Sequence, residues 1–526
     1  MQKKNIANVL AENTFWVYGG KIITQLFGFI VTIFVIKKLS VDVYGTFNFL
    51  VASYALFKII GIASFTSVFD RFIPEFVKNN DYVKLKKLIV LVIIISSIVL
   101  TCLIILMGVF QESYGKLFKI DNFSMYIVPF VFFVVLSYLQ TLTLSILNSL
   151  LLQKYLVSIQ IFRSIVGPLL YLWFLTILDV KIMLIIESIL IALLVIPSFF
   201  IIKNHIFKRI SLNTSPKSIL NIRKRITRYF LFSSFDQFGA GIIGAKVDPF
   251  IIASIGNQYL VGIYSFSNKM FLMSGKVLPI ADFMKIVNPI YYQKFTASNL
   301  DQDKFTHMSN FILKILLPIR IAPFVFFLVF GKQIINYIYD PKYIEAYWIV
   351  CLMFLSPILN CWGTPLGMVI KLFEKMEIFL ISRIIGVLSI ILGVLLMIYW
   401  GIVGVVIATT ICSLLKWFVM YFLMRKHLPI IYHFKEMRNY FIISISIVSL
   451  FLIIQPFIIN IFSLLLFSAA FLILFVLLII IFHPFNEEDL VMLKKISDSS
   501  VLLRKSERII LKIHSIRSQF SKIKIS

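Results

Sequence analysis

Positively charged side chains inside long apolar segments are the residues of this chain whose type and spacing could bind a ligand. A Lys or Arg at the centre of a lipid bilayer costs roughly 2.5–3.5 kcal/mol, so such residues usually face a partner or a water-filled cavity. We predict a cavity lined by Lys21, Lys58, Arg163, Lys246, Lys269, Lys276 and Arg383. Cations gathered in one cavity repel one another unless an anion is present. The pattern therefore favours a negatively charged ligand.

Acidic side chains in the same apolar segments are fewer and could neutralise only part of this charge. Asp248 is followed by Pro249, which removes a helix hydrogen bond and is expected to break or kink the helix there. A carboxylate beside a helix break is a candidate for binding a coupling ion, Na⁺ or H⁺, and Asp236 and Glu187 are further candidates. Pairing of Asp248 with Lys246 or with a neighbouring helix is an equally open interpretation.

Three lysines near the predicted ends of spans, Lys285, Lys314 and Lys416, are expected to extend their ammonium groups to the membrane surface. Catalysis has little support in the sequence. The histidines fall in loops, helix ends or the tail, the cysteines lie in apolar spans without CxxC spacing, and no P-loop, GxSxG or HExxH motif occurs. We expect no enzymatic activity, no metal and no cofactor apart from the coupling ion.

The elements that must position these residues are membrane-spanning helices. Apolar residues make up 60% of the 526-residue sequence and charged residues 14%, and the mean hydropathy is +0.96. A span needs about 20 apolar residues. About fourteen such stretches occur: 15–36, 44–69, 88–110, 125–152, 156–178, 180–202, 229–254, 260–290, 311–331, 343–370, 377–399, 401–424, 440–459 and 461–483. The sequence thus predicts an all-α polytopic membrane protein, with loops too short for an independent domain.

The distribution of Lys and Arg predicts the orientation, because cytoplasmic loops carry an excess of basic residues. With a cytoplasmic N-terminus, the basic segments 71–87, 203–228 and 425–438 and the C-terminal tail all become cytoplasmic. Both termini are therefore expected on the cytoplasmic side of the cell (inner) membrane. The tail, 484–526, has the spacing of an interfacial amphipathic helix. The net charge of +27 then indicates anchoring and contact with anionic lipids rather than nucleic-acid binding.

Two pairs of similar segments indicate an internal repeat at an offset of about 220 residues. Residues 153–167 resemble 374–386, and residues 43–49 resemble 260–266. Six spans separate the copies, and an even number keeps them in the same orientation. We expect two six-helix lobes related by a pseudo-two-fold axis along the membrane normal. The expected divisions are the lobes 1–202 and 229–424, the basic linker 203–228, two extra helices within 440–483 and the tail 484–526.

Three runs carry a family resemblance: NTFWVYGGKIITQLFGFIVTIFVIKKLSVDVYGTFNFL, then FDRFIPEF, and VDPFIIASIGNQYLVGIYSFSNK in the second half. They resemble polysaccharide-type flippases, O-antigen flippases among them, of the multidrug/oligosaccharidyl-lipid/polysaccharide exporter superfamily. The resemblance implies alternating-access transfer of an undecaprenyl-diphosphate-linked oligosaccharide from the cytoplasmic to the outer leaflet for surface polysaccharide assembly. It implies membrane lipids and the polysaccharide polymerase machinery as partners. The diphosphate is expected nearest Lys58, Lys269 and Lys276.

Three alternatives stay open. The two extra helices also resemble lipid II-type flippases. A drug or toxin exporter of the same superfamily would mostly carry cations and is expected to have an acidic cavity instead. An integral-membrane glycan polymerase or glycosyltransferase should have a long external loop with clustered acids, whereas the predicted external loops are short.

Overall fold

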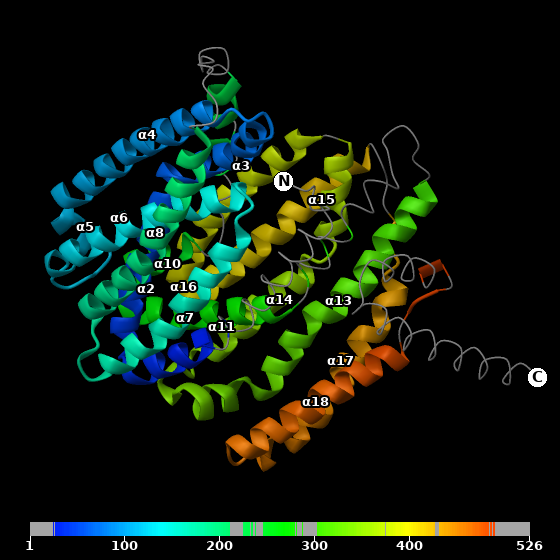
Figure 1. Ribbon diagram of the computed structural model, residues 1–526. Coiled ribbons are helices and arrows are strands. Elements are labelled where there is room, and N and C mark those ends of the chain that lie inside the picture. Colours follow the sequence, from blue (N-terminus) through cyan, green and yellow to red (C-terminus); the bar gives the residue numbers. More distant parts are fainter. Residues whose placement is uncertain are drawn as a thin grey trace, which may run out of the picture. The chain divides into compact units, whose positions relative to one another are not determined.

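The computed structural model describes residues 25, 27–210, 225–231, 233–234, 237, 246–278, 280, 284, 287, 302–373, 375–426, 431–482, 484–486 and 488–489. Almost all of these residues lie in helices, and no strand occurs among them (Figure 1). The expectation of an all-α chain is confirmed. The candidate site residues Lys21 and Asp236 lie outside the described residues, as do the lysine Lys285 and most of the tail.

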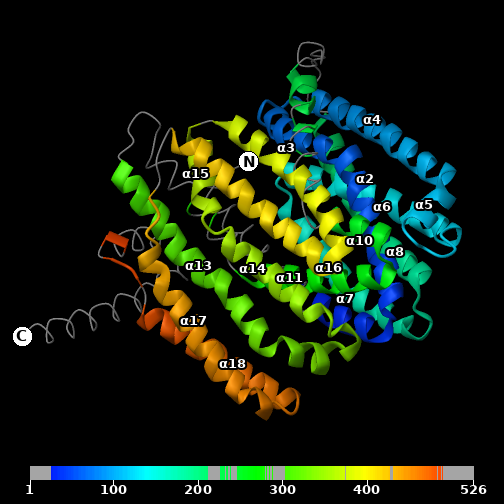
Figure 2. The ribbon, with the colours of Figure 1, turned by 180° about the vertical axis from the view of Figure 1, so that it is seen from behind.

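The chain divides into two compact units, Met1–Ser265 and Phe266–Ser526. The first contains α2 (Val41–Gly61), α3 (Ala63–Lys78), α4 (Tyr82–Val109), α5 (Gln111–Leu117), α6 (Ser124–Ser149), α7 (Gln153–Trp173), the short 3₁₀ helix η1 (Leu175–Ile177), α8 (Val180–Ile210), α10 (Asp248–Ile255) and the start of α11 (Gln258–Val277). Helices α6 and α8 lie side by side (Figures 1 and 2). The boundary falls inside α11, where the start of this helix packs against α2. The division into lobes around 203–228 stays a prediction.

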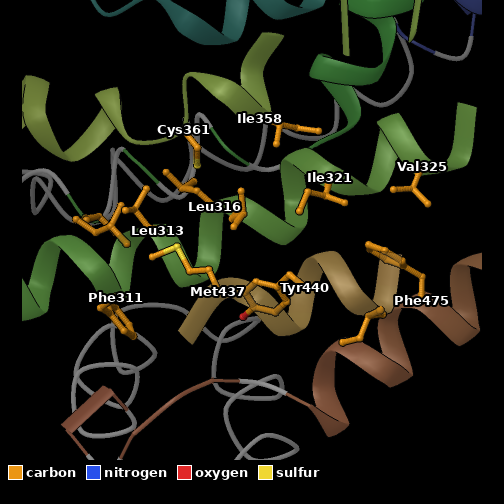
Figure 3. Close-up of a cluster of buried hydrophobic side chains, with 14 of the residues drawn as sticks. Phe311, Leu313, Leu316, Ile321, Val325, Ile358, Cys361, Met437, Tyr440 and Phe475 are labelled. Carbon is orange, nitrogen blue, oxygen red and sulfur yellow. The ribbon is translucent and has the colours of Figure 1, made fainter. Parts of the chain in front are cut away.

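The second unit is built around one long helix, α13. Its elements are α13 (Gln302–Gln333), the π-helix η2 (Ile334–Tyr339), the 3₁₀ helix η3 (Pro341–Tyr343), α14 (Ala346–Leu359), α15 (Gly363–Leu372), α16 (Met376–Arg425), α17 (Phe434–Ile454), the 3₁₀ helix η4 (Gln455–Phe457) and α18 (Ile461–Ile481). Helices α17 and α18, the two extra C-terminal helices, lie along α13 (Figures 1 and 2). Leu316 of α13, Met437 and Tyr440 of α17 and Phe475 of α18 belong to one buried core (Figure 3).

Helices long and apolar enough to cross a membrane number eight in the described part of the chain, or nine if the bent pair α14 and α15, at 43° to each other, is one span. Helix α16 spans 50 residues but contains a break at Gly401, with φ 58° and ψ −145°. A positive φ favours glycine, and this break coincides with the boundary predicted between 377–399 and 401–424. The total of fourteen spans stays a prediction, since half of the first predicted span lies outside the described residues.

The outer surfaces of these helices are apolar. On α18, Phe462, Leu465 and Ile473 are largely exposed, although every residue of the helix is apolar or small. Such surfaces are unfavourable in water and are expected where a helix faces lipid. Together with the long apolar helices, they identify the chain as a multi-pass membrane protein.

The span predicted at 44–69 is broken in the structure. Helix α2 ends at Gly61 and α3 begins at Ala63, with Ile62 between them at φ −131° and ψ −35°. Helix α3 buries Phe69 and Phe72 on one side while Asp70 and Arg71 stay exposed. A helix with one apolar and one charged side suits the membrane surface better than its interior, which explains the break.

The two short segments matched by the repeat, 43–49 and 260–266, pack against each other at a crossing of α2 and α11. Gly45 and Gly262 hold the same place in the two segments. A Cβ atom built on Gly45 would overlap the carbonyl oxygen of Gln258 and lie 2.7 Å from the amide nitrogen of Gly262, and one built on Gly262 would overlap the carbonyl oxygen of Val41. Val41 and Gln258 each lie one turn before the glycine of their own helix. The contact is therefore reciprocal, as at a local two-fold axis.

Candidate functional site

Two of the predicted cavity lysines come together in the first unit. Lys58 lies half-buried in the last turn of α2, and Lys246 lies in the turn that precedes α10. Their positive charges are close enough to interact electrostatically. Neither forms an ion pair with a carboxylate within the part of the chain that the structure describes. The C-terminal dipole of α2 favours a cation at Lys58. Among the described residues, the pair therefore has no compensating carboxylate.

Asp248 is the first residue of α10, and Pro249 sits in the first turn of this short helix. Lys246 and Val247 form a turn before it, which confirms the helix break that the Asp-Pro sequence predicts. The Asp248 carboxylate is buried, and its Oδ2 accepts a hydrogen bond from the hydroxyl of Tyr264 on α11 at 2.6 Å. Of the two pairings left open by the sequence, the neighbouring helix supplies the partner and Lys246 does not.

Arg163 and Glu187, predicted for two different roles, are partners of each other. The Arg163 guanidinium on α7 lies 2.6 Å from Glu187 Oε2 on α8, and the hydroxyl of Tyr171 donates to Glu187 Oε1 at 2.9 Å. The pair links α7 to α8 and neutralises both charges. Arg163 consequently adds little positive charge to a cavity, and Glu187 is less available to a coupling ion.

In the second unit, Arg383 lies half-buried on α16, where its charge interacts with that of Lys416. Residues 401–424, the span that the repeat equates with the one carrying Glu187, contain no acid. The Arg163–Glu187 pairing therefore has no counterpart from that span. On α11, Lys269 is exposed, while only the backbone of Lys276 is described. The expected approach of Lys58 to Lys276 stays a prediction.

The expectation that Lys314 reaches the membrane surface is wrong. Lys314 is 2% exposed, and its Nζ lies 2.6 Å from both Asp489 Oδ2 and Glu436 Oε2. Once these carboxylates are adjacent, two ion pairs, of which the one with Asp489 is also a hydrogen bond, replace the hydration that snorkelling would otherwise supply. The sequence did carry a weak signal, since three acids, Glu487 to Asp489, begin four residues after the end of the last predicted span.

Arg320, a further intramembrane cation, stabilises the break between α14 and α15. At this break the amide of Cys361 bonds to Ile358 rather than to Pro357, so the Pro357 carbonyl loses its helical partner. Arg320 donates to that oxygen at 2.8 Å and to Thr364 Oγ1 at 3.1 Å. An unsatisfied carbonyl in a membrane costs several kcal/mol, so this cation has a structural role.

A set of contacts that sequence reasoning missed joins the loop before α6 to the end of α10. Lys119 Nζ donates to the carbonyls of Ile255 and Gly256 at 2.8 and 2.7 Å, and the Gln258 amide donates to the Phe118 carbonyl at 2.6 Å. A cation at a helix C-terminus satisfies carbonyls that lack helical partners. Both loops lie on the side that the topology predicts to be external, as does the crossing at Gly45. The contacts therefore hold the α5–α6 loop, the end of α10 and the start of α11 together at one end of the first unit.

Metal chemistry receives no support from the described residues, among which no group of three His, Cys, Asp or Glu could hold an ion. The arrangement suits binding of an anion at Lys58 and Lys246, and of a small cation or proton at Asp248.

Comparisons with known proteins agree with the architecture. The family of polysaccharide biosynthesis proteins matches residues 10–283. No curated protein sequence matches the chain. Among solved structures, the lipid II flippase MurJ in an inward closed conformation matches with a TM-score of 0.59 and 15% identity, over 88% of this chain and 98% of that one. An inward-facing multidrug resistance MATE family transporter of the MOP superfamily matches with a TM-score of 0.55 and 14% identity, over 77% and 94%.

At these identities the structural likeness shows the fold alone, which is a transporter fold shared by MurJ and MATE proteins. The family match is broader evidence, because it extends from the first predicted span to α11 and covers more than half of the sequence. The chain belongs to the polysaccharide biosynthesis protein family.

Proposed function

We propose that the chain moves a lipid-diphosphate-linked oligosaccharide from the cytoplasmic to the outer leaflet of the cell membrane by alternating access. The family match and the fold that the chain shares with MurJ and MATE transporters support a role in transport. The single observation that carries the substrate class is that Lys58 and Lys246, whose charges interact, form no ion pair with a carboxylate among the residues that the structure describes. A diphosphate would supply the missing negative charge through charge-assisted hydrogen bonds.

The proposed anion site centres on Lys58 and Lys246. The other proposed members of the cationic cavity are Lys21, Lys269, Lys276 and Arg383. Arg163 is proposed only as a positioning residue, because Glu187 already neutralises it. A cationic drug would be repelled by the Lys58 and Lys246 pair, which makes a drug exporter the weaker alternative.

We further propose that both termini lie on the cytoplasmic side of the inner membrane. His307 and Asp489, which come from two segments predicted to be cytoplasmic, lie 3.4 Å apart, which supports placing these segments on the same side. Membrane lipids and the polymerase that consumes the flipped glycan are the proposed partners, and lipid II-type glycans belong to the same substrate class.

The proposed function is tested in proteoliposomes loaded with a fluorescent undecaprenyl-diphosphate oligosaccharide. We expect the protein to make the label accessible to a membrane-impermeant quencher over time, with the mass of the glycolipid unchanged. A matched probe with the same lipid chain and sugar but no phosphate should move at least about 10-fold more slowly, since each ionic hydrogen bond contributes about 1.5–3 kcal/mol. A change in glycan length would instead identify a polymerase, and equal rates for both probes would reject the anion site.

Asp248 is proposed as the residue that couples transport to a Na⁺ or H⁺ gradient, because a buried carboxylate can bind a cation in one conformation and release it in another. In the same vesicles, dissipating both gradients should slow the wild type. Asp248→Asn should be slower by about 10-fold, the effect of about 1.4 kcal/mol, and should no longer respond to the gradients. Tyr264→Phe, which removes only the hydrogen bond, should keep the response. If dissipation changes neither wild type nor Asp248→Asn, the cargo's own gradient drives transport.

A further inference from the structure

A buried cluster of charges attaches the segment after α18 to α13 and α17 within the second unit. Lys314 of α13 bridges Glu436 of α17 and Asp489, with both N–O distances at 2.6 Å. Asp489 Oδ2 also accepts a hydrogen bond from the backbone amide of Asn486 at 2.9 Å, and the Tyr440 hydroxyl donates to the Lys314 carbonyl at 2.9 Å. Five groups from three segments therefore meet at one place.

The charges of this cluster do not balance. Lys314 brings one positive charge, whereas Glu436 and Asp489 bring two negative charges. Glu436 is 30% exposed, His433 Nδ1 lies 3.3 Å from its Oε1, and the Lys314 ammonium lies 2.6 Å from its buried Oε2. Asp489 is 0% exposed, and its Oδ1 has no hydrogen-bond partner in the described part of the chain. A buried carboxylate oxygen without a donor is costly. The cluster lacks one positive charge, and the deficit lies at Asp489 Oδ1.

His307 occupies the position from which that charge can come. Its Nε2 lies 3.4 Å from Asp489 Oδ1 and 3.3 Å from Glu488 Oε2, and neither ring nitrogen has a hydrogen-bond partner within the described residues. His307 and Lys314 are seven residues apart on α13, so they share one face of the helix two turns apart. Histidine is the side chain that ordinarily changes its charge between pH 5 and 8.

The other charged groups around His307 that the structure describes do not supply the missing charge. On α13, Asp303 lies one turn before His307 and is itself acidic. From α17, His433 faces Glu436 rather than Asp489. From the segment after α18, Glu488 adds a second carboxylate next to the imidazole. Each of these described neighbours thus either favours a proton on His307 or leaves it unaffected.

We propose that His307 binds a proton from the cytoplasm and that the segment after α18 is thereby held more tightly on α13. The proton enters from water onto the imidazole, which then donates from Nε2 to Asp489 and Glu488 and makes the buried cluster neutral. Because protonation creates these ion pairs, the added stability is present at low pH and is lost as the pH rises and the imidazole becomes neutral. The contacts all lie in the second unit, so the proposal is independent of the transported substrate.

The test compares the melting temperatures of wild type, His307→Gln and the control His205→Gln in lipid nanodiscs at pH 6 and pH 8. A thiol-reactive fluorophore reports unfolding, since Cys361 is fully buried in the core of the same unit. We expect wild type to exceed His307→Gln by about 2 °C at pH 6 and to equal it at pH 8. His205→Gln, whose histidine lies in the first unit, should follow wild type at both values.

A second variant and a second measurement exclude misfolding of His307→Gln as the cause of a lower melting temperature. Asp489→Asn should lose the gain in melting temperature at pH 6, although Lys314 keeps its ion pair with Glu436. Amide hydrogen exchange across residues 484–489 should slow at pH 6 in wild type but not in His307→Gln. The proposal would be overturned if the difference in melting temperature between wild type and His307→Gln were the same at pH 6 and at pH 8. A gain that follows Na⁺ concentration at constant pH would also overturn it and would identify a sodium site.

Discussion

Gly45→Ala and Gly262→Ala are each expected to destabilise the protein by about 1–3 kcal/mol and to abolish most of the translocation activity. A methyl group at either position meets backbone rather than a side chain that could rotate away, because the neighbours are the carbonyls of Gln258 and Val41. Helices α2 and α11 must therefore separate. Thermal melts and the vesicle assay measure the two effects.

The matched control for this pair is Gly108→Ala. Gly108 lies within α4, and a Cβ atom built there meets nothing within 4 Å. Alanine has the higher helix propensity, so this control should be neutral or slightly stabilising. The double variant Gly45→Ala, Gly262→Ala should cost less than the sum of the singles, because one separation of the helices accommodates both methyl groups. Wild-type melting of Gly45→Ala would show that the crossing is not as close as described.

The double variant Lys58→Ala, Lys246→Ala is expected to reduce translocation of the diphosphate-linked glycan by about 100-fold, since each lysine contributes an ionic hydrogen bond of about 1.5–3 kcal/mol. Its melting temperature should equal or exceed that of wild type, because removing two like charges that interact relieves repulsion. This combination separates a lost binding site from a lost fold.

The control for the lysine pair is Lys38→Ala, whose side chain is exposed on the side predicted to be external. It should transport normally. The double variant Lys58→Arg, Lys246→Arg should retain part of the translocation activity, because the charge is kept while the geometry changes. Wild-type transport by the double alanine variant would remove Lys58 and Lys246 from the site and leave the anion to the remaining proposed cations.

The sequence alone was sufficient to predict the membrane class and the helix breaks at Gly401 and Pro249, but not the breaks at Ile62 and between α14 and α15. A bilayer demands about 20 apolar residues per span whatever surrounds them, so α18 at Ile461–Ile481 follows closely the predicted 461–483. Gly401 and Pro249 act through their own backbone geometry. The predicted boundaries at these two residues therefore needed no knowledge of neighbouring helices.

The repeat also came from sequence, but its meaning required the structure. Similar segments at 43–49 and 260–266 predicted duplication. Only the packed chain shows that Gly45 and Gly262 meet each other, because a sequence offset does not state which faces of two helices touch.

The partners of the intramembrane charges were decided by tertiary structure alone. Lys314 finds Asp489 at a separation of 175 residues, Arg163 finds Glu187 at 24, and Lys58 meets another lysine. A cation in a span can be paired with an acid, cap a helix or be free to bind a ligand. Which of these applies depends on the helix faces that lie beside it. The apolar pattern that places a helix in the bilayer is nearly the same on every side of it. Hydropathy therefore specifies that a residue lies in the membrane, and only packing specifies what it contacts there.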